Sequence, residues 1–404
     1  MKNKKVIIIL TSLVVLIGGI LFVNQIYNKP NIKHIPKQNN LAIMIKEDGA
    51  EDYTKSSSKD IPKGNYTLNR DKSYCKNNGV IGDYDSTLGK VRFSFIGTDN
   101  CYLYFDYEVP GIKFETAFAA NNSDIFNENG IRYEGADPNN YICLDNKTEG
   151  TCSDSSLLFR IIGLFDEDTS LDGTNSSGTK KLLKIIDTNN YGGTSGKDWN
   201  STGKNNWSSA SLKTELNETY LTTLLGTSNV NVKLSSAIAN AKWHLGGASK
   251  SNYKTLTAEG IYIEERNTSA IYSGNPSSIY AQVGLMYPSD YSYATVGGTT
   301  TNKSSCREKE LHNWNSSTHS DCKNNDWLFT SQSSFVNSYE WLLSPFSLNS
   351  SYAAALNLSG FVSLVGNGAN YTRFAVRPTF YLDSSLLKIV GEGDGTKDNA
   401  YRVG

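Results

Sequence analysis

The sequence lacks several features that would point to a defined chemistry. Its 404 residues include only 3 Met, 9 Pro and 6 Cys, and neither a Gly-x-Ser-x-Gly elbow nor a Cys-x-x-Cys pair occurs. Lys and Arg number 39 against 40 Asp and Glu, so the basic excess that a nucleic-acid-binding protein usually carries is missing. The sequence therefore gives no support to a serine hydrolase with an elbow, a Cys-x-x-Cys zinc site or a nucleic-acid partner.

Long apolar runs are also scarce, and the one exception lies near the start. Val6 to Val23 is unbroken and follows several lysines. At ~1.5 Å per residue such a run covers most of a ~30 Å hydrocarbon core, and the lysines favour a cytoplasmic N-terminus. A cleavable signal peptide is the alternative, but the run is long and no small-x-small cleavage site follows it. We therefore expect residues 1–27 to form a cytoplasmic stub and a single-pass transmembrane anchor in the cell membrane, with the bulk of the chain extracellular.

The six cysteines fit an exported protein. An even number of cysteines in an exported chain indicates disulfides, although the sequence alone does not fix their pairing. Because the cysteines cluster locally, we expect the pairs Cys75 with Cys101, Cys143 with Cys152, and Cys306 with Cys322.

The composition changes along the chain and suggests its domain organisation. Residues 28–40 form a polar linker with two prolines and several lysines. Residues 41–109 predict a small all-β domain, because two alternating apolar runs, 91–95 and 101–107, flank a Gly-Thr-Asp-Asn turn typical of a β-hairpin. Residues 110–140 are a polar connector, and residues 141–404 form the main domain.

The main domain shows both strand and helix patterns. Strands are predicted at 157–165, 181–187, 279–287, 339–345 and 373–382, with a hairpin over 352–366. Helices are predicted at 209–225, where leucines recur at helical spacing, and at 235–245. Two helices between strand-rich stretches predict an α+β domain with an antiparallel sheet.

The order of several motifs resembles a family of uncharacterised bacterial extracellular domains. The motifs are Phe159-Arg160-Ile161-Ile162-Gly163, then Trp207 with Ser209 to Asn217, then Trp341-Leu342-Leu343-Ser344-Pro345, and lastly Val376 to Leu382. The layout of two helices followed by a closing sheet also resembles the C-type-lectin-like fold, which formylglycine-generating enzymes use. Those enzymes need a reactive cysteine pair near the end of the chain, whereas no cysteine follows Cys322. The resemblance therefore implies a binding module more than that activity.

Two groups of residues could form metal sites, but a simpler structural interpretation is favoured for each. Asp168, Ser170, Asp172 and Gly173 match the first half of a calcium loop, but Thr179 stands where a bidentate Glu is expected, which favours an acidic turn. Cys306, His312, His319 and Cys322 contain the ligand types of a zinc site, but exported cysteines usually oxidise, which favours a disulfide loop. We expect no cofactor.

The best candidate site is an aromatic and Asn-rich surface near the C-terminal hairpin. Flat amphipathic rings bind sugars or peptides at low entropic cost. The candidate ligand-binding residues are Trp314, Trp327, Tyr352, Asn357, Asn367, Asn370, Tyr371 and Arg373. We expect a non-enzymatic surface protein that binds a glycan or a protein. The alternatives are an extracellular enzyme with an unrecognised site and a structural component of the envelope.

Overall fold

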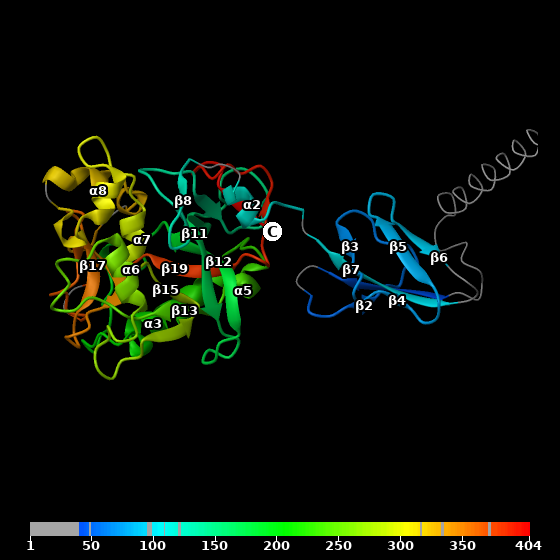
Figure 1. Cartoon of the computed structure of the whole chain (residues 1–404), viewed down its shortest axis with the longest axis horizontal. Coiled ribbons are helices and arrows are strands. Elements are labelled where there is room, and N and C mark those ends of the chain that lie inside the picture. Colours follow the sequence, from blue (N-terminus) through cyan, green and yellow to red (C-terminus); the bar gives the residue numbers. More distant parts are fainter. Residues whose placement is uncertain are drawn as a thin grey trace, which may run out of the picture. The chain divides into compact units, whose positions relative to one another are not determined.

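The computed structural model describes residues 40–47, 50–94, 99–108, 110–119, 123–315, 317–332, 335–370 and 373–404. The chain divides into two compact units between Pro110 and Gly111 (Figure 1). The apolar run predicted to be a membrane anchor lies outside the described residues. Of the helices in the described part of the chain, none combines the length and the apolar character that a membrane crossing requires.

The first unit is built from two small sheets. Its strands are β1 (Asn40–Lys46), β2 (Thr54–Lys55), β3 (Tyr66–Leu68), β4 (Tyr74–Cys75), β5 (Val80–Asp85), β6 (Lys90–Ser94) and β7 (Asn100–Tyr107). One sheet has the order β2-β1-β7-β3 with β4 also paired to β7, and the other is the hairpin of β5 and β6. Ile43, Ile61, Leu103 and Phe105 form the buried core, against which side chains of the β5–β6 hairpin pack.

The predicted hairpin between 91–95 and 101–107 is wrong. β6 pairs with β5, whereas β7 pairs with β1 in parallel and with β3 and β4 in antiparallel orientation. The apolar alternation of β7 is better matched by Leu41, Ile43 and Ile45 of β1, which lie opposite Cys101, Leu103 and Phe105. The Gly-Thr-Asp-Asn sequence predicted a hairpin between neighbouring strands, but β7 pairs instead with β1, about sixty residues earlier in the chain.

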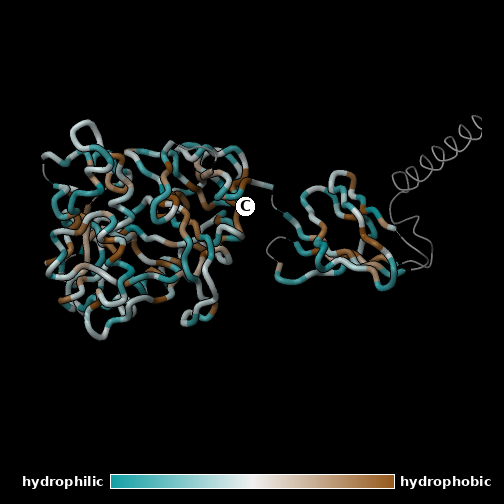
Figure 2. The backbone as a smooth tube through the Cα atoms, in the orientation of Figure 1, coloured by the Kyte–Doolittle hydropathy of each residue, from teal (hydrophilic) through white to brown (hydrophobic). Residues whose placement is uncertain are grey.

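The second unit is organised around a large sheet. Its strands are β8 (Ile125–Asn127), β9 (Ile131–Tyr133), β10 (Tyr141–Cys143), β11 (Leu158–Thr169), β12 (Gly178–Asp187), β13 (Ala241–His244), β14 (Ser278–Ala281), β15 (Val283–Leu285), β16 (Tyr339–Pro345), β17 (Ala353–Asn357), β18 (Val362–Ser363), β19 (Pro378–Asp383), β20 (Ile389–Val390) and β21 (Tyr401–Val403). Eleven of them form one sheet with the central order β15-β19-β12-β11-β10-β21-β20, and β16, β17 and β18 form a separate three-stranded sheet. The long strands β11 and β12 carry hydrophobic stretches of the chain through this unit (Figure 2).

Short helices surround these sheets. The α-helices are α2 (Phe114–Ala119), α3 (Ser211–Glu215), α4 (Leu221–Leu225), α5 (Leu234–Ala237), α6 (Ala258–Arg266), α7 (Pro288–Tyr293), α8 (Lys303–Glu308), α9 (Ser320–Asn324) and α10 (Trp327–Thr330), and a π-helical turn, η5 (Leu216–Tyr220), joins α3 to α4. Single 3-10 turns are η2 (Ser155–Leu157), η3 (Gly193–Ser195), η4 (Trp207–Ser209), η6 (Leu311–Asn313) and η7 (Ser317–His319).

The α+β fold class predicted for the chain is wrong. The structure is mostly β, with 33% strand and 20% helix. The helix predicted over 209–225 is present as α3, η5 and α4, but the one predicted over 235–245 is a single turn, α5, followed by β13. Here Ala241 and Trp243 are buried while Lys242 and His244 are half-buried. Burial that alternates from one residue to the next is the pattern of a strand and not of a helix. Residues 110–140 were predicted to be a connector, but they contain α2, β8 and β9, and both strands belong to the large sheet.

Candidate functional site

The main sheet of the first unit has two faces of different character. Along β7, Cys101, Leu103 and Phe105 are buried, whereas Tyr102 and Tyr104 alternate with them and are half-buried. Successive side chains of a strand point to opposite faces, so the two tyrosines lie on the face turned away from the core.

Pairing across the sheet shows which other residues share this face. In β1, Ala42, Met44 and Lys46 lie opposite Tyr102, Tyr104 and Asp106. In β2 and β4, Lys55 lies opposite Met44 and Tyr74 lies opposite Tyr102. Tyr53, which precedes β2, joins them through a contact with Tyr104. We call Tyr53, Tyr74, Tyr102 and Tyr104 the tyrosine face.

The rings of the tyrosine face form two pairs. Tyr74 and Tyr102 stack with 4.9 Å between ring centroids and 15° between planes. Tyr53 meets Tyr104 edge to face, with centroids 5.0 Å apart and planes at 86°. Tyr74 is 48% exposed and the other three are half-buried, so each pair retains ring surface that solvent reaches.

A small polar network holds the second pair in place. The hydroxyl of Tyr53 donates to Oδ1 of Asp106 at 2.5 Å, and Nδ2 of Asn69 donates both to Oδ2 of Asp106 and to the oxygen of Tyr53. Burial, with the hydrogen bond to Asp106, raises the pKa of Tyr53 to about 12. The ring of Tyr53 is therefore held in one position by contacts within the unit.

The ligand-binding surface predicted near the C-terminal hairpin loses its two tryptophans, which are buried. Trp314 and Trp327 are each 0% exposed, because they fill the core of the second unit. Nε1 of Trp327 donates to the carbonyl of Tyr133, and Arg160 lies over its ring. Neither tryptophan can stack on a ligand.

The remaining predicted residues are scattered. Asn357 and Asn367 are 8% and 7% exposed, and their side chains bond the hairpin backbone, as acceptor from Ser359 and as donor to Ala353. Tyr352 packs against Phe346 and is half-buried. The exposed members are Asn370 and Arg373, and Tyr371 lies outside the described residues.

The histidines singled out in the sequence are not the ones beside a buried acid. His312 lies edge-on to the rings of Tyr253 and Phe361, and Nδ1 of His319 hydrogen bonds to Thr318. It is His244 that approaches Glu167, with 3.4 Å between Nε2 and Oε2. The strand alternation of β13 could have placed His244 there, but that segment was predicted to be a helix.

His244 belongs to a buried charged network. Arg266 contacts both Glu167 and Glu265, and the backbone and hydroxyl of Ser289 donate to Glu265. Burial raises the pKa of Glu265 to about 7, although the charge of Arg266 opposes the rise. The carboxyls of Glu167 and Glu265 are 8% and 0% exposed and already engaged, so the network links β11, β13, α6 and α7 below the surface.

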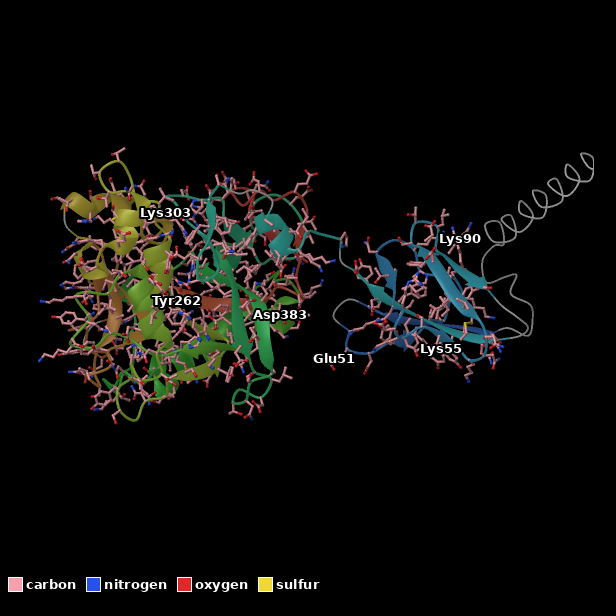
Figure 3. The ribbon with its side chains drawn as sticks, viewed as in Figure 1. Glu51, Lys55, Lys90, Tyr262, Lys303 and Asp383 are labelled. Atoms are coloured by element: carbon pink, nitrogen blue, oxygen red, sulfur yellow. A yellow bond between two sulfur atoms is a disulfide. The ribbon has the colours of Figure 1, made fainter. Side chains whose placement is uncertain are left out.

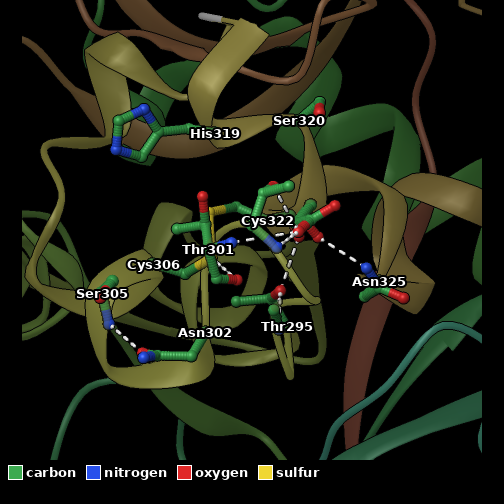
Figure 4. Close-up of a disulfide and its surroundings, with 12 residues drawn as sticks. Thr295, Thr301, Asn302, Ser305, Cys306, His319, Ser320, Cys322 and Asn325 are labelled. Atoms are coloured by element: carbon green, nitrogen blue, oxygen red, sulfur yellow. Dashed lines mark hydrogen bonds between the residues drawn. A yellow bond between two sulfur atoms is a disulfide. The ribbon is translucent and has the colours of Figure 1, made fainter.

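The disulfides match the predicted pairs. Cys75 is bonded to Cys101, Cys143 to Cys152, and Cys306 to Cys322. In Figure 4 the ring of His319 points away from the Cys306–Cys322 bond, and a disulfide sulfur is no thiolate ligand. The predicted alternative of a zinc site at this place is therefore not supported.

The acidic loop between β11 and β12 is closed on itself. Oδ1 of Asp172 accepts from the backbone of Thr174 and Asn175, and Asp168 accepts from Ser176 and Tyr280. These bonds hold the loop as a compact turn, and the calcium loop stays an untested alternative.

A shallow depression lies beside this loop. Its volume is about 400 Å³, and Leu171, Lys213, Asn217, Asn240, Tyr280, Ala281 and Gln282 line it. The lining is mostly polar and includes Lys213 and Tyr280, but neither a histidine nor a carboxylate is among these residues.

Comparison of the chain with models of known protein families, with curated proteins and with solved structures finds no match. The resemblance to bacterial extracellular domains therefore stays a prediction.

Proposed function

We propose that this chain is a non-enzymatic binding protein that acts outside the cytoplasm and holds a polymeric glycan against the tyrosine face. The observation that carries the proposal is the pairing of four solvent-accessible tyrosines on one face of a sheet whose other face is the core. Tyrosine presents a flat apolar ring with a polar rim, which suits the apolar faces and hydroxyl edges of sugars.

The disulfides support the location. Structural disulfides form and persist in oxidising compartments and are rare in the cytosol. All three bonds are present, and among the described residues no cysteine is free. Glycans are abundant on the outer side of a cell membrane, where such a protein would act.

The charged network weighs against the enzyme alternative. Its histidine and carboxylates hydrogen bond or ion pair with one another below the surface, and its most exposed members, His244 and Arg266, are each only 20% exposed. A general acid or base must lie within hydrogen-bond reach of its substrate.

A glycan array probed with the full chain tests the proposal. The wild-type chain should bind at least one polymeric glycan, and Tyr74→Ala with Tyr102→Ala should lose that binding. Tyr74→Phe with Tyr102→Phe keeps both rings and should retain most of it. Equal binding by the alanine variant, with its fold verified by circular dichroism, would remove the tyrosine face as the site.

A further inference from the structure

The tyrosine face has more positively charged side chains around it than carboxylates. Lys72 places its ammonium nitrogen 4.8 Å from the ring centroid of Tyr53, and Lys76 lies 5.6 Å from that of Tyr102. Lys46 and Lys55 reach the same face from β1 and β2 by register. Against these four lysines, the strands place one carboxylate on the face, that of Asp106.

The single carboxylate does not balance the lysines. Asp106 already accepts from Tyr53 and Asn69, so its oxygens are committed within the unit. Glu51 and Asp52 lie in the segment before β2, and Asp71 lies in the turn before β4. Asp52 and Asp71 are sequence neighbours of Tyr53 and Lys72, but among the described residues none of these three acids forms an ion pair with Lys46, Lys55, Lys72 or Lys76. The face thus offers cations beside rings, which complements a chain of rings that carries negative charge.

The spacing of the rings fits a polymer. Tyr102 and Tyr104 are two residues apart on one strand, which separates their Cα atoms by ~7 Å. Tyr74 stands beside Tyr102 on β4, whereas Tyr53 stands beside Tyr104, so the two ring pairs follow the strand. An extended ligand that runs along β7 would meet one pair after the other.

We infer that the tyrosine face and its four lysines bind an anionic polysaccharide. This inference rests on the proposed function and names the ligand class of the same site. Sugar rings lie on the tyrosines, and carboxylate or phosphate groups of the polymer pair with Lys46, Lys55, Lys72 and Lys76. A single-stranded nucleic acid also combines rings with negative charge, but the Cys75–Cys101 disulfide is typical of proteins outside the cytosol, and this favours a glycan.

Dextran and carboxymethyl-dextran test the charge requirement because they share one backbone and differ in charge. The full chain should bind carboxymethyl-dextran and should bind dextran at least tenfold more weakly. Lys72→Gln with Lys76→Gln should weaken binding of carboxymethyl-dextran about tenfold, as expected when two exposed charge contacts are lost. Raising NaCl to ~0.5 M should weaken it further, because salt screens exposed charges.

A matched control removes the same charge elsewhere in the unit. The side chain of Lys63 lies close to Gly89, and Gly89 belongs to the turn before β6. Lys90 is the first residue of β6. Lys90 and Lys55 come from different sheets, as Figure 3 shows. Lys63→Gln with Lys90→Gln should leave binding of carboxymethyl-dextran unchanged.

The outcomes separate this inference from the proposed function. Equal binding of dextran and carboxymethyl-dextran, lost in Tyr74→Ala with Tyr102→Ala, would overturn the anionic ligand and keep the glycan-binding function. Binding of poly-L-glutamate as tight as that of carboxymethyl-dextran would show that charge alone is recognised, and tighter binding of oligothymidylate would identify a nucleic-acid surface. Failure to bind any glycan would overturn both proposals.

Discussion

Lys184 and Asp290 form an ion pair in the core of the second unit, with 2.5 Å between Nζ and Oδ2. Their side chains are 1% and 2% exposed, and Arg132 contacts the other carboxylate oxygen at 3.2 Å. Burial acts to raise the pKa of Asp290, but the two cations outweigh it and hold the pKa below its usual range. The pair joins β12 to α7 and so ties a helix to the centre of the sheet.

Lys184→Met should destabilise the second unit by about 3 kcal/mol, because removal of one partner leaves a buried carboxylate undercompensated. Lys180→Met is a matched control on the same strand, since Lys180 is 47% exposed where it pairs with Asp383. It should cost at most ~1 kcal/mol. Urea unfolding measures both, and a Lys184→Met variant as stable as Lys180→Met would contradict a structural role for the pair.

Glu265 should make stability depend on pH. Its pKa rises from 4.5 to about 7 on folding. Between these values the folded state holds the proton and the unfolded state does not, so this stabilisation is complete below pH 4.5 and is lost as pH rises to about 7. The loss is about 3 kcal/mol at most. Unfolding of wild type and Glu265→Gln across this range should show the wild type weakening relative to the variant; parallel curves would contradict the shift.

The Cys75–Cys101 bond should matter most to the first unit, whose core is small. It closes a loop with a sequence separation of 26, so Cys75→Ser with Cys101→Ser should cost about 3 kcal/mol. Limited proteolysis should then cleave within residues 40–110 first. Cys143→Ser with Cys152→Ser opens a loop in the other unit and should leave the first unit as resistant as before.

Gly247 tolerates no side chain. A Cβ there would lie 1.9 Å from the carbonyl oxygen of Pro345, which is backbone and cannot rotate away. Gly247→Ala should therefore cost about 2 kcal/mol or more in thermal unfolding. Gly260 in α6 is the control, because its nearest contacts are at 3.4 Å and alanine favours a helix interior. Loss of stability in both variants alike would show that the close approach is not the cause.

Much of the second unit could be predicted because its signals are local. The apolar runs of β11, β12 and β16 mark strands, and the leucines of 209–225 mark a helix, since each pattern repeats within one element. The disulfides were equally accessible, because each joins cysteines that are neighbours among the six.

What the sequence concealed depends on contacts between distant segments. Trp314 has polar neighbours along the chain, and this pattern predicts a surface loop. In the structure Trp314 is buried, and Tyr291 of α7 packs against it. The tyrosine face is assembled from β4, β7 and the segment before β2, and its rings meet only through the pairing of β4 with β7 and the contact of Tyr53 with Tyr104. Hydrophobic periodicity reports which side of a strand is buried, but not which strand lies beside it.

The parallel pairing of β1 with β7 also determines when the first unit can fold. β1 is the first strand of the unit and β7 is the last, so β1 cannot form its main pairing until β7 has been synthesised. Until then the apolar side chains of β1 have no strand beside them. Early local structure cannot accumulate into a stable intermediate, because most of the buried core side chains come from these two strands, Ile43 from β1 and Leu103 and Phe105 from β7. The unit should therefore assemble late and slowly for its size, because its core needs contacts between segments that are distant in the sequence.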